Sequence, residues 1–322
     1  MKLSVLTNLF GSMPLDEALA KFEKLGIEAV EIGCGGYPGN DHCKPDVLLH
    51  DEKALAAFKE TIARHHMEIC ALSVHGNPIH PDKELAASFH NDFEKTVLLA
   101  EKLGIDTVVT FSGCPGGSPE DKTPNWVTCP WPNDFGAILD YQWNEVLIPY
   151  WKKTAAFAEA HGVTKIAFEM HPGFCVYNPE TLLRLRAAVG NVIGANFDPS
   201  HLIWQGIDPV AAIRVLEGAI YHFHAKDTRI DKYNTEKFGV LDTKTFSDEI
   251  HRSWIFRSVG YGNDQLYWRD MISNLRLVGY DKVMSIEHED SLMNQEEGLA
   301  HAVAFLKESM IREPRPSDLR WI

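Results

Sequence analysis

The segment KLGIEAVEI at positions 24–32 is the clearest indication of how this chain folds. It recurs in outline as KLGIDTVVT at 102–110 and as LVGYDKVMS at 277–285. Each copy reads as the end of a helix, a glycine turn and the start of a strand, because Gly often follows the last helical residue and apolar β-branched residues favour strands. The three copies predict a chain built from repeated helix-to-strand units.

Eight short apolar segments are spread along the chain as candidate strands. Most are near-continuous apolar runs, as expected of parallel strands that are covered on both faces. The predicted strands are Leu3–Thr7, Ala29–Ile32, Ile69–Val74, Thr107–Phe111, Lys165–Glu169, Val192–Phe197, Ile220–Ala225 and Val283–Glu287. Amphipathic segments between them, often bounded by Pro or Gly, predict helices at Leu15–Leu25, Lys53–His65, Ala86–Leu103, Glu145–His161, Glu180–Ala188 and Val210–Leu216.

This alternation predicts an α/β fold, a (β/α)8 TIM barrel that spans residues 1–322 as a single domain. The alternative is a doubly wound open sheet. Its usual GxGxxG signature after the first strand is absent, since Gly33, Gly35 and Gly36 follow the second strand without that spacing. Two long loops, 112–140 and 228–262, follow strands 4 and 7, at the barrel face that carries active sites.

Composition excludes several classes of function. Asp and Glu outnumber Lys and Arg by 45 to 31, which gives a formal charge of −14. The sequence has no cluster of basic residues of the kind that binds nucleic acids. No apolar run approaches the roughly 20 residues of a membrane helix. The six cysteines form no CxxC pair, which favours reduced thiols, and the N-terminus lacks a signal peptide. We therefore expect a cytoplasmic protein.

Carboxylates and a histidine stand at the ends of the last four predicted strands. In chain order they are Glu169, Asp198, His224 and Glu287. Because barrel strands converge at the mouth, one side chain from each strand can surround a single ion. This mostly oxygen donor set suits Mn²⁺, Mg²⁺ or Co²⁺ better than a thiolate-selected zinc site. Taken alone, Asp198 could equally be a helix cap, but buried charges on four adjacent strand ends would repel one another unless a cation or a pKa shift offset them.

Other polar residues near these strand ends have two interpretations each. His75, at the end of strand 3, is a candidate substrate contact or a loop histidine that caps a backbone group. Lys226 and Arg257 are candidates to bind substrate oxygens, or they form salt bridges within the protein. His222 points to the same side as His224, which favours a structural or supporting role.

The strand ends resemble those of the sugar phosphate isomerase/epimerase superfamily, the xylose isomerase-like barrels that also include AP endonucleases. The shared motifs are FEMHPG at 168–173, FDPSHLIWQGIDP at 197–209, HAKD at 224–227 and SIEHED at 285–290. The resemblance implies that Glu169, Asp198, His224 and Glu287 bind one divalent ion. Mn²⁺ is the expected ion, with Mg²⁺, Co²⁺ or Zn²⁺ as alternatives.

The resemblance also implies a metal-dependent sugar isomerase or epimerase. Glu169 and Glu287 would move a proton next to a carbonyl of a sugar or keto-sugar, with His201 and Lys226 beside the substrate. The endonuclease branch is disfavoured, because strand 4 ends in Phe111-Ser112-Gly113, where that branch has a histidine. No phosphate-binding pattern is clear at the mouth, which favours a non-phosphorylated substrate.

A narrower likeness connects the Trp-rich insertion after strand 4 and the EHED ending to the larger subunit of bacterial C-glycoside deglycosidases. These enzymes cleave a 3-oxo-C-glycoside by β-elimination and have a small β-rich partner chain. The long loops contain or adjoin Trp126, Trp131, Trp254 and Trp268, which could stack on a sugar or an aglycone, or pack in a homo-oligomer or against a small partner subunit. A non-catalytic sugar-binding or assembly subunit is the alternative from another class.

Overall fold

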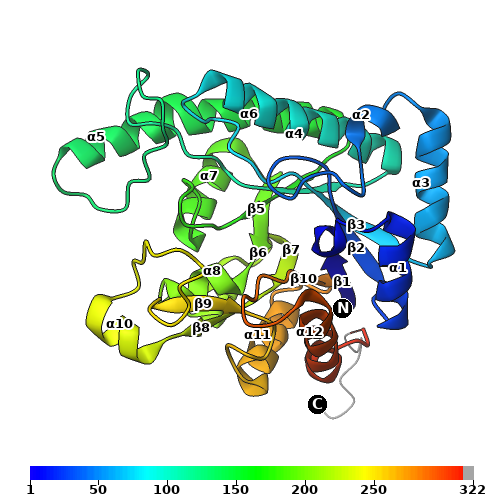
Figure 1. The fold of residues 1–322 in the computed structure, drawn as a ribbon. Coiled ribbons are helices and arrows are strands. Elements are labelled where there is room, and N and C mark those ends of the chain that lie inside the picture. Colours follow the sequence, from blue (N-terminus) through cyan, green and yellow to red (C-terminus); the bar gives the residue numbers. More distant parts are fainter. Residues whose placement is uncertain (315–322) are drawn as a thin grey trace, which may run out of the picture.

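A closed barrel of eight parallel strands forms the centre of the computed structural model, which describes residues 1–314 (Figure 1). The strands are β1 (Lys2–Leu6), β2 (Ala29–Gly33), β3 (Glu68–Ser73), β4 (Thr107–Thr110), β5 (Lys165–Glu169), β6 (Ile193–Phe197), β7 (Ile220–Ala225) and β10 (Val283–Ile286). They pair in chain order, and β10 pairs with β1 to close the barrel. The eight predicted strands are confirmed, and closure of the barrel excludes the open sheet.

Helices follow the strands in alternation and surround the barrel (Figure 1). They are α1 (Leu15–Lys24), α2 (Pro45–Leu48), α3 (Glu52–Arg64), α4 (Lys83–Leu103), α5 (Asp134–Tyr141), α6 (Ile148–Ala160), α7 (Pro179–Val189), α8 (Pro199–Trp204), α9 (Pro209–Val215), α10 (Lys232–Phe238), α11 (Gln265–Leu277) and α12 (Gln295–Ser309). A short 3₁₀ turn (Thr7–Phe10) follows β1, and a π-helical turn (Gln142–Leu147) joins α5 to α6. This alternation confirms the TIM barrel.

The repeated turn has the same backbone geometry in all three copies. Gly26, Gly104 and Gly279 have φ angles of 71°, 72° and 85°, a left-handed conformation that other residues adopt only with strain. In each copy the N–H of the following residue donates to a carbonyl oxygen five residues earlier, at 2.8 to 3.1 Å. This closes the helix with a Schellman motif and directs the chain into the next strand.

The two long loops contain more regular structure than the sequence predicts. Helix α5 lies in the first loop and buries no side chain, so it lacks the apolar stripe by which a helix is recognised. The second loop contains α10 and an antiparallel hairpin of β8 (Asp227–Ile230) and β9 (Trp254–Arg257). Both insertions extend from the same side of the barrel in Figure 1.

The apolar core lies mainly between the strands and the helices. Its largest fully buried apolar side chains are Trp143, Trp151, Trp268, Phe22, Phe93, Phe168, Phe197 and Phe223. Of the loop tryptophans, Trp254 and Trp268 are therefore core residues, whereas Trp131 is 73% exposed. The barrel interior is more polar: Glu31 on β2 contacts His222 and His224 on β7, strands that are not neighbours in the sheet.

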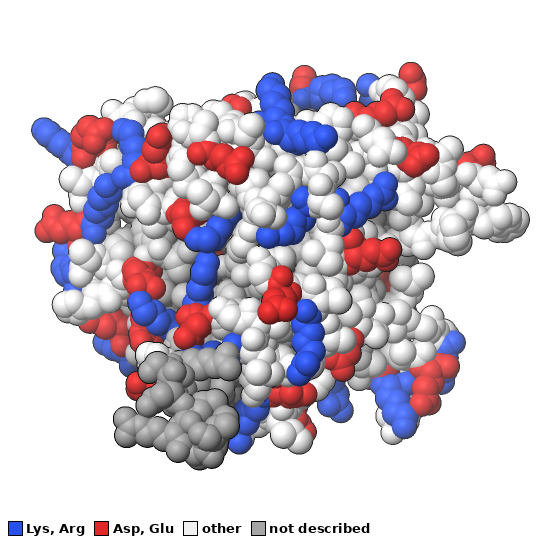
Figure 2. Space-filling view, turned by 180° about the vertical axis from the view of Figure 1, so that it is seen from behind, with Lys and Arg blue, Asp and Glu red and all other residues white. Residues whose placement is uncertain are grey.

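The surface carries charges of both signs. On the face shown in Figure 2, the acidic and basic side chains of the described residues are interspersed and do not form a broad basic field. Among residues 1–314, no helix has both the length and the apolar character needed to cross a lipid bilayer.

Candidate functional site

Four side chains from the last four barrel strands meet at one point of the barrel mouth. Glu169 ends β5, Asp198 follows β6, His224 lies in β7 and Glu287 follows β10. One donor atom from each residue lies within 4.8 Å of the others. The Nδ1 atom of His224 is 3.2 Å from a carboxylate oxygen of Glu169 and 3.2 Å from one of Glu287. The structure thus brings together the four residues that the sequence selects as metal ligands.

Two of these donor atoms have unsatisfied hydrogen-bonding capacity. Oδ2 of Asp198 and Nδ1 of His224 are buried and make no well-formed hydrogen bond among the described residues, although Nζ of Lys226 lies 3.1 Å from Oδ2 and carboxylate oxygens lie 3.2 Å from Nδ1. The other carboxylate oxygen of Asp198 accepts the N–H of Ser200 at 2.8 Å and so caps α8. Asp198 therefore caps the helix with one oxygen and presents the other to the cluster, so the cap does not prevent a role as a ligand. Burying polar atoms without well-formed hydrogen bonds is costly, and a bound cation would be coordinated by both.

The second ring nitrogen of His224 is held by Glu31. Nε2 of His224 lies 3.0 and 2.9 Å from the two carboxylate oxygens of Glu31, which also accept hydrogen bonds from His222, Ser73 and Ser285. Burial opposes ionisation of Glu31, but the two histidines hold its pKa well below the usual range. An ionised carboxylate only accepts, so Nε2 of His224 donates and Nδ1 is left to face the cluster.

Lys226 is the one permanent cation that contacts this cluster within the described chain. Its side chain is 2% exposed, and Nζ lies 2.7 Å from Glu287, 3.0 Å from Glu289 and 3.1 Å from Asp198. Burial lowers the pKa of Lys226, but these carboxylates raise it well above its usual value. One ammonium does not balance the buried carboxylates of this interior, and a divalent cation fits the remaining negative charge.

Glu169 is surrounded by hydrogen-bond donors. Nε2 of His75 lies 3.1 Å from one of its oxygens, Nε2 of His201 lies 2.9 Å from the other, and Asn196 donates at 3.2 Å. Burial raises the pKa of Glu169, but the neighbouring imidazoles of His201, His224 and His75 hold it well below the usual range. Glu169 is therefore an ionised, firmly positioned carboxylate.

Arg257 lies apart from the other predicted substrate contacts. Its Nε donates to both carboxylate oxygens of Asp290, at 3.1 and 3.0 Å, and its guanidinium lies over the ring of Tyr261. Arg257 is not among the residues that line the mouth cavity. The structure therefore places Arg257 in the salt bridge that the sequence allows as the alternative.

A cavity of about 230 Å³ opens at the mouth beside the cluster. Its lining includes Glu169, Glu287, Lys226 and His75, together with Leu6, Asn8, Tyr37, Pro38, Phe111, His171 and Glu289. Asp198, His201 and His224 are not among these lining residues. The sequence prediction did not include His171 or Glu289, although both lie within the FEMHPG and SIEHED motifs.

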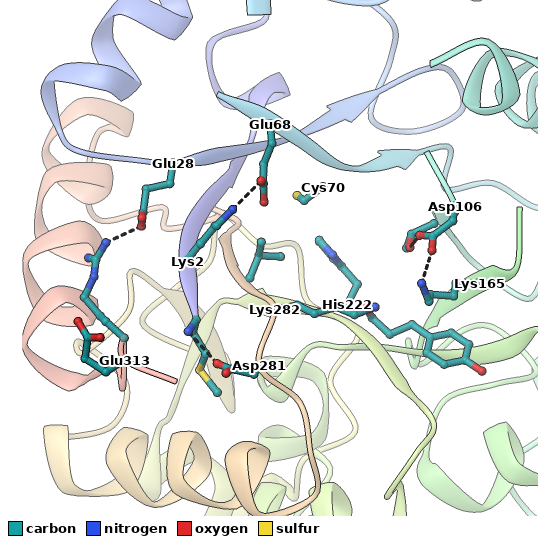
Figure 3. Close-up of a pocket in the computed structure, with 15 residues that line it drawn as sticks. Lys2, Glu28, Glu68, Cys70, Asp106, Lys165, His222, Asp281, Lys282 and Glu313 are labelled. Atoms are coloured by element: carbon teal, nitrogen blue, oxygen red, sulfur yellow. Dashed lines mark hydrogen bonds and ion pairs between the residues drawn. The ribbon is translucent and has the colours of Figure 1, made fainter. Parts of the chain in front are cut away.

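A larger cavity of about 630 Å³ lies at the opposite end of the barrel (Figure 3). Salt bridges join its charged walls, with Lys2 2.6 Å from Glu68 and the N-terminal amine 2.8 Å from Asp281. His222 faces this cavity from β7 (Figure 3). In TIM barrels this end usually contributes to stability, and the active site lies at the other end. We therefore place the candidate site at the smaller cavity.

Comparisons with known proteins identify the family of this barrel. Residues 19–309 match the family described as xylose isomerase-like TIM barrel. The chain is 43% identical over 312 residues to YfiH of Bacillus subtilis (strain 168), a protein described as uncharacterized, with 96% of this chain and 99% of YfiH covered. The narrower likeness to C-glycoside deglycosidases stays a prediction.

Two solved structures share the barrel at low sequence identity. One is the IolI protein with a bound zinc atom, at 20% identity and a TM-score of 0.65, covering 96% of this chain and 98% of IolI. The other is a D-tagatose 3-epimerase-like protein, at 21% identity and a TM-score of 0.63 with the same coverage. At this identity the likeness shows the fold alone. The match to the family model confirms the predicted resemblance. The chain therefore belongs to the xylose isomerase-like TIM-barrel family.

Proposed function

We propose that the protein is a divalent-metal-dependent enzyme that moves a proton next to the carbonyl of a sugar or keto-sugar. The observation that supports it best is the cluster of Glu169, Asp198, His224 and Glu287, in which two buried donor atoms make no well-formed hydrogen bond. Two similar barrels, the IolI protein with its bound zinc atom and a D-tagatose 3-epimerase-like protein, support this proposal.

The four residues would hold one ion through three carboxylates and one imidazole nitrogen. Mn²⁺ is the expected ion, with Mg²⁺, Co²⁺ or Zn²⁺ as alternatives. When bound, the ion would supply Lewis-acid polarisation of the substrate's carbonyl and neighbouring hydroxyl oxygens. The pKa of His224 is lowered by burial but raised well above its usual value by Glu31 and Glu287, and the same negative charges would attract a metal ion in place of the proton.

Glu169 and Glu287 are suited to carry the substrate proton because both line the mouth cavity. Burial raises the pKa of Glu287, but Lys226 and His224 lower it to about 2, so both carboxylates are ionised near neutral pH. One would accept the proton from the carbon next to the carbonyl, and the other would return a proton. His75 and His201 fix the orientation of Glu169, and Lys226 fixes that of Glu287.

The destination of the proton decides the reaction. Return of the proton to the opposite face of the same carbon gives an epimer. Return of the proton to the former carbonyl carbon gives an aldose–ketose isomer. If a group on the β carbon departs with its bonding electrons, the result is elimination, as in the C-glycoside alternative. All three reactions share the first proton transfer, which the site supports equally.

Solvent-deuterium exchange tests the proposal and its non-catalytic alternative. The metal-loaded protein would be incubated in D₂O with free ketoses and 3-oxo-glucosides, and deuterium at the α carbon would be followed by NMR. We expect deuterium to enter at this carbon even where no net product forms. A sugar-binding or assembly subunit would bind sugar without exchange, and that result would refute the proposed catalysis.

Glu31→Gln is expected to weaken Mn²⁺ binding by about 10–100-fold, the usual cost of losing a partner that orients a metal-binding histidine. The amide keeps the volume but can present its NH₂ to Nε2 of His224, so the ring loses its fixed tautomer. Isothermal titration calorimetry would measure the affinity. Glu68→Gln is the matched control, because Glu68 pairs with Lys2 at the far end of the barrel. Equal affinities in the two variants would contradict this role of Glu31.

A further inference from the structure

A second cavity, of about 340 Å³, lies beside the mouth cavity and is not used by the mechanism above. It is lined by His171, Phe246, Ile255, Phe256, Glu289 and Ser291. His171 and Glu289 also line the mouth cavity. The two cavities therefore adjoin at these two residues, and the second cavity is next to the place where a ligand at the mouth would lie.

The second cavity has an aromatic wall that is fixed to the β8–β9 hairpin. The rings of Phe246 and Phe256 stack at 5.8 Å with an interplanar angle of 18°. Arg252 lies over Phe246 at 4.3 Å and over Trp254 at 4.6 Å, and Trp254 stacks on Trp204 of α8 at 4.6 Å. This wall is preformed, as ligand sites usually are, although Phe246 remains 58% exposed.

The aromatic wall also touches the proposed reaction site. Nζ of Lys226 lies over the ring of Phe256 at 4.8 Å, and the ring of His201 meets Phe256 edge-on at 5.3 Å. Phe256 therefore contacts residues of the polar site and also lines the second cavity. Polar groups at the mouth suit a hydroxylated ring, whereas the apolar side chains of Phe246, Ile255 and Phe256 suit an apolar one.

We propose that the substrate has two parts, a sugar or keto-sugar at the mouth and an aromatic group bound in the second cavity against Phe246 and Phe256. This inference rests on the proposed function, because it assigns the substrate class of the same site: glycosides with an aromatic aglycone, and not free sugars. A substrate group is the expected occupant because the two cavities share His171 and Glu289 and because Phe256 contacts Lys226 of the reaction site.

The test compares methyl 3-oxo-β-D-glucopyranoside with phenyl 3-oxo-β-D-glucopyranoside, two probes that differ only in the aglycone. Their affinities for the Mn²⁺-loaded protein would be measured by isothermal titration calorimetry. We expect the phenyl probe to bind about tenfold tighter, since one aromatic ring is removed from water. Phe246→Ala should bring the affinity ratio close to one. Ile250→Ala, which removes another exposed apolar side chain of the same segment that does not line the cavity, should keep it.

The inference is overturned if the phenyl probe does not bind, if the two probes bind equally, or if Phe246→Ala leaves the ratio unchanged. An unchanged ratio with an altered sedimentation coefficient would assign the aromatic wall to a contact between protein chains. Deuterium exchange into the same probes separates the two proposals. Equal exchange and equal affinity contradict only the aromatic subsite, whereas tighter phenyl binding without exchange contradicts only the proposed catalysis.

Discussion

Glu287→Gln is expected to lower the turnover number by about 10²–10⁴-fold while the metal ion remains bound, because general-base catalysis typically contributes that much. The amide oxygen can still face the ion, but the neutral amide cannot accept the substrate's α proton. Turnover would be measured as α-deuterium exchange at saturating Mn²⁺, and metal content by elemental analysis of the same sample. Glu169→Gln should give a loss of similar size.

Glu289→Gln is the matched control for this prediction. Glu289 lies two residues along the same strand end, also lines the mouth cavity and also accepts a hydrogen bond from Lys226, at 3.0 Å. It lies outside the metal cluster, so its loss should reduce exchange far less. Normal exchange by a fully metal-loaded Glu287→Gln variant would show that Glu287 does not carry the proton.

Asp198→Asn is expected to abolish the stabilisation of the fold by Mn²⁺. At an ion concentration of 100 times the dissociation constant, binding adds about 2.7 kcal/mol to the free energy of unfolding of the wild-type protein, which raises Tm by several degrees. Asn caps a helix about as well as Asp, so the N–H of Ser200 keeps its acceptor. Differential scanning calorimetry with and without Mn²⁺ would measure the effect.

The metal-free form of this variant gives a second, opposite expectation. Burial raises the pKa of Asp198, so the ionised carboxylate is disfavoured in the folded state, and this destabilisation persists above its folded-state pKa. Metal-free Asp198→Asn should therefore be at least as stable as the metal-free wild type near neutral pH. Asp208→Asn is the control, because Asp208 caps α9, also ahead of a proline, but lies outside the cluster. An undiminished response of Asp198→Asn to Mn²⁺ would contradict the ligand assignment.

The grouping of the four candidate ligands could be predicted from the sequence because it follows from strand order. Each of the four residues ends a consecutive strand, and parallel strands deliver their carboxyl ends to one mouth. The roles that could not be predicted from the sequence belong to residues whose contacts span the barrel. Glu31 meets His224 from 193 residues away, through an interior contact that no local pattern encodes. Its one signal is a carboxylate within the apolar strand AVEIG.

The second cavity could not be predicted from the sequence for a different reason. Phe246 lies in a polar insertion, and Phe256 belongs to a four-residue strand of the hairpin. Neither segment has a periodicity that reveals which side chains face a pocket. The aromatic composition of this loop was visible, but Trp254 turned out to be buried behind the wall, while the phenylalanines line the cavity. Packing of the hairpin on α8 decides this, and packing is not readable from the segment alone.

Anomalous diffraction from crystals grown with Mn²⁺ tests the central claim most directly. The described residues contain three groups that could hold an ion: Glu169, Asp198, His224 and Glu287; Glu31, His222 and His224; and Glu169, His171 and His201. We predict a single anomalous peak within about 2.3 Å of donor atoms of the first group. A peak in either of the other groups, or a fully soaked crystal without a peak at the mouth, would contradict the proposed metal centre.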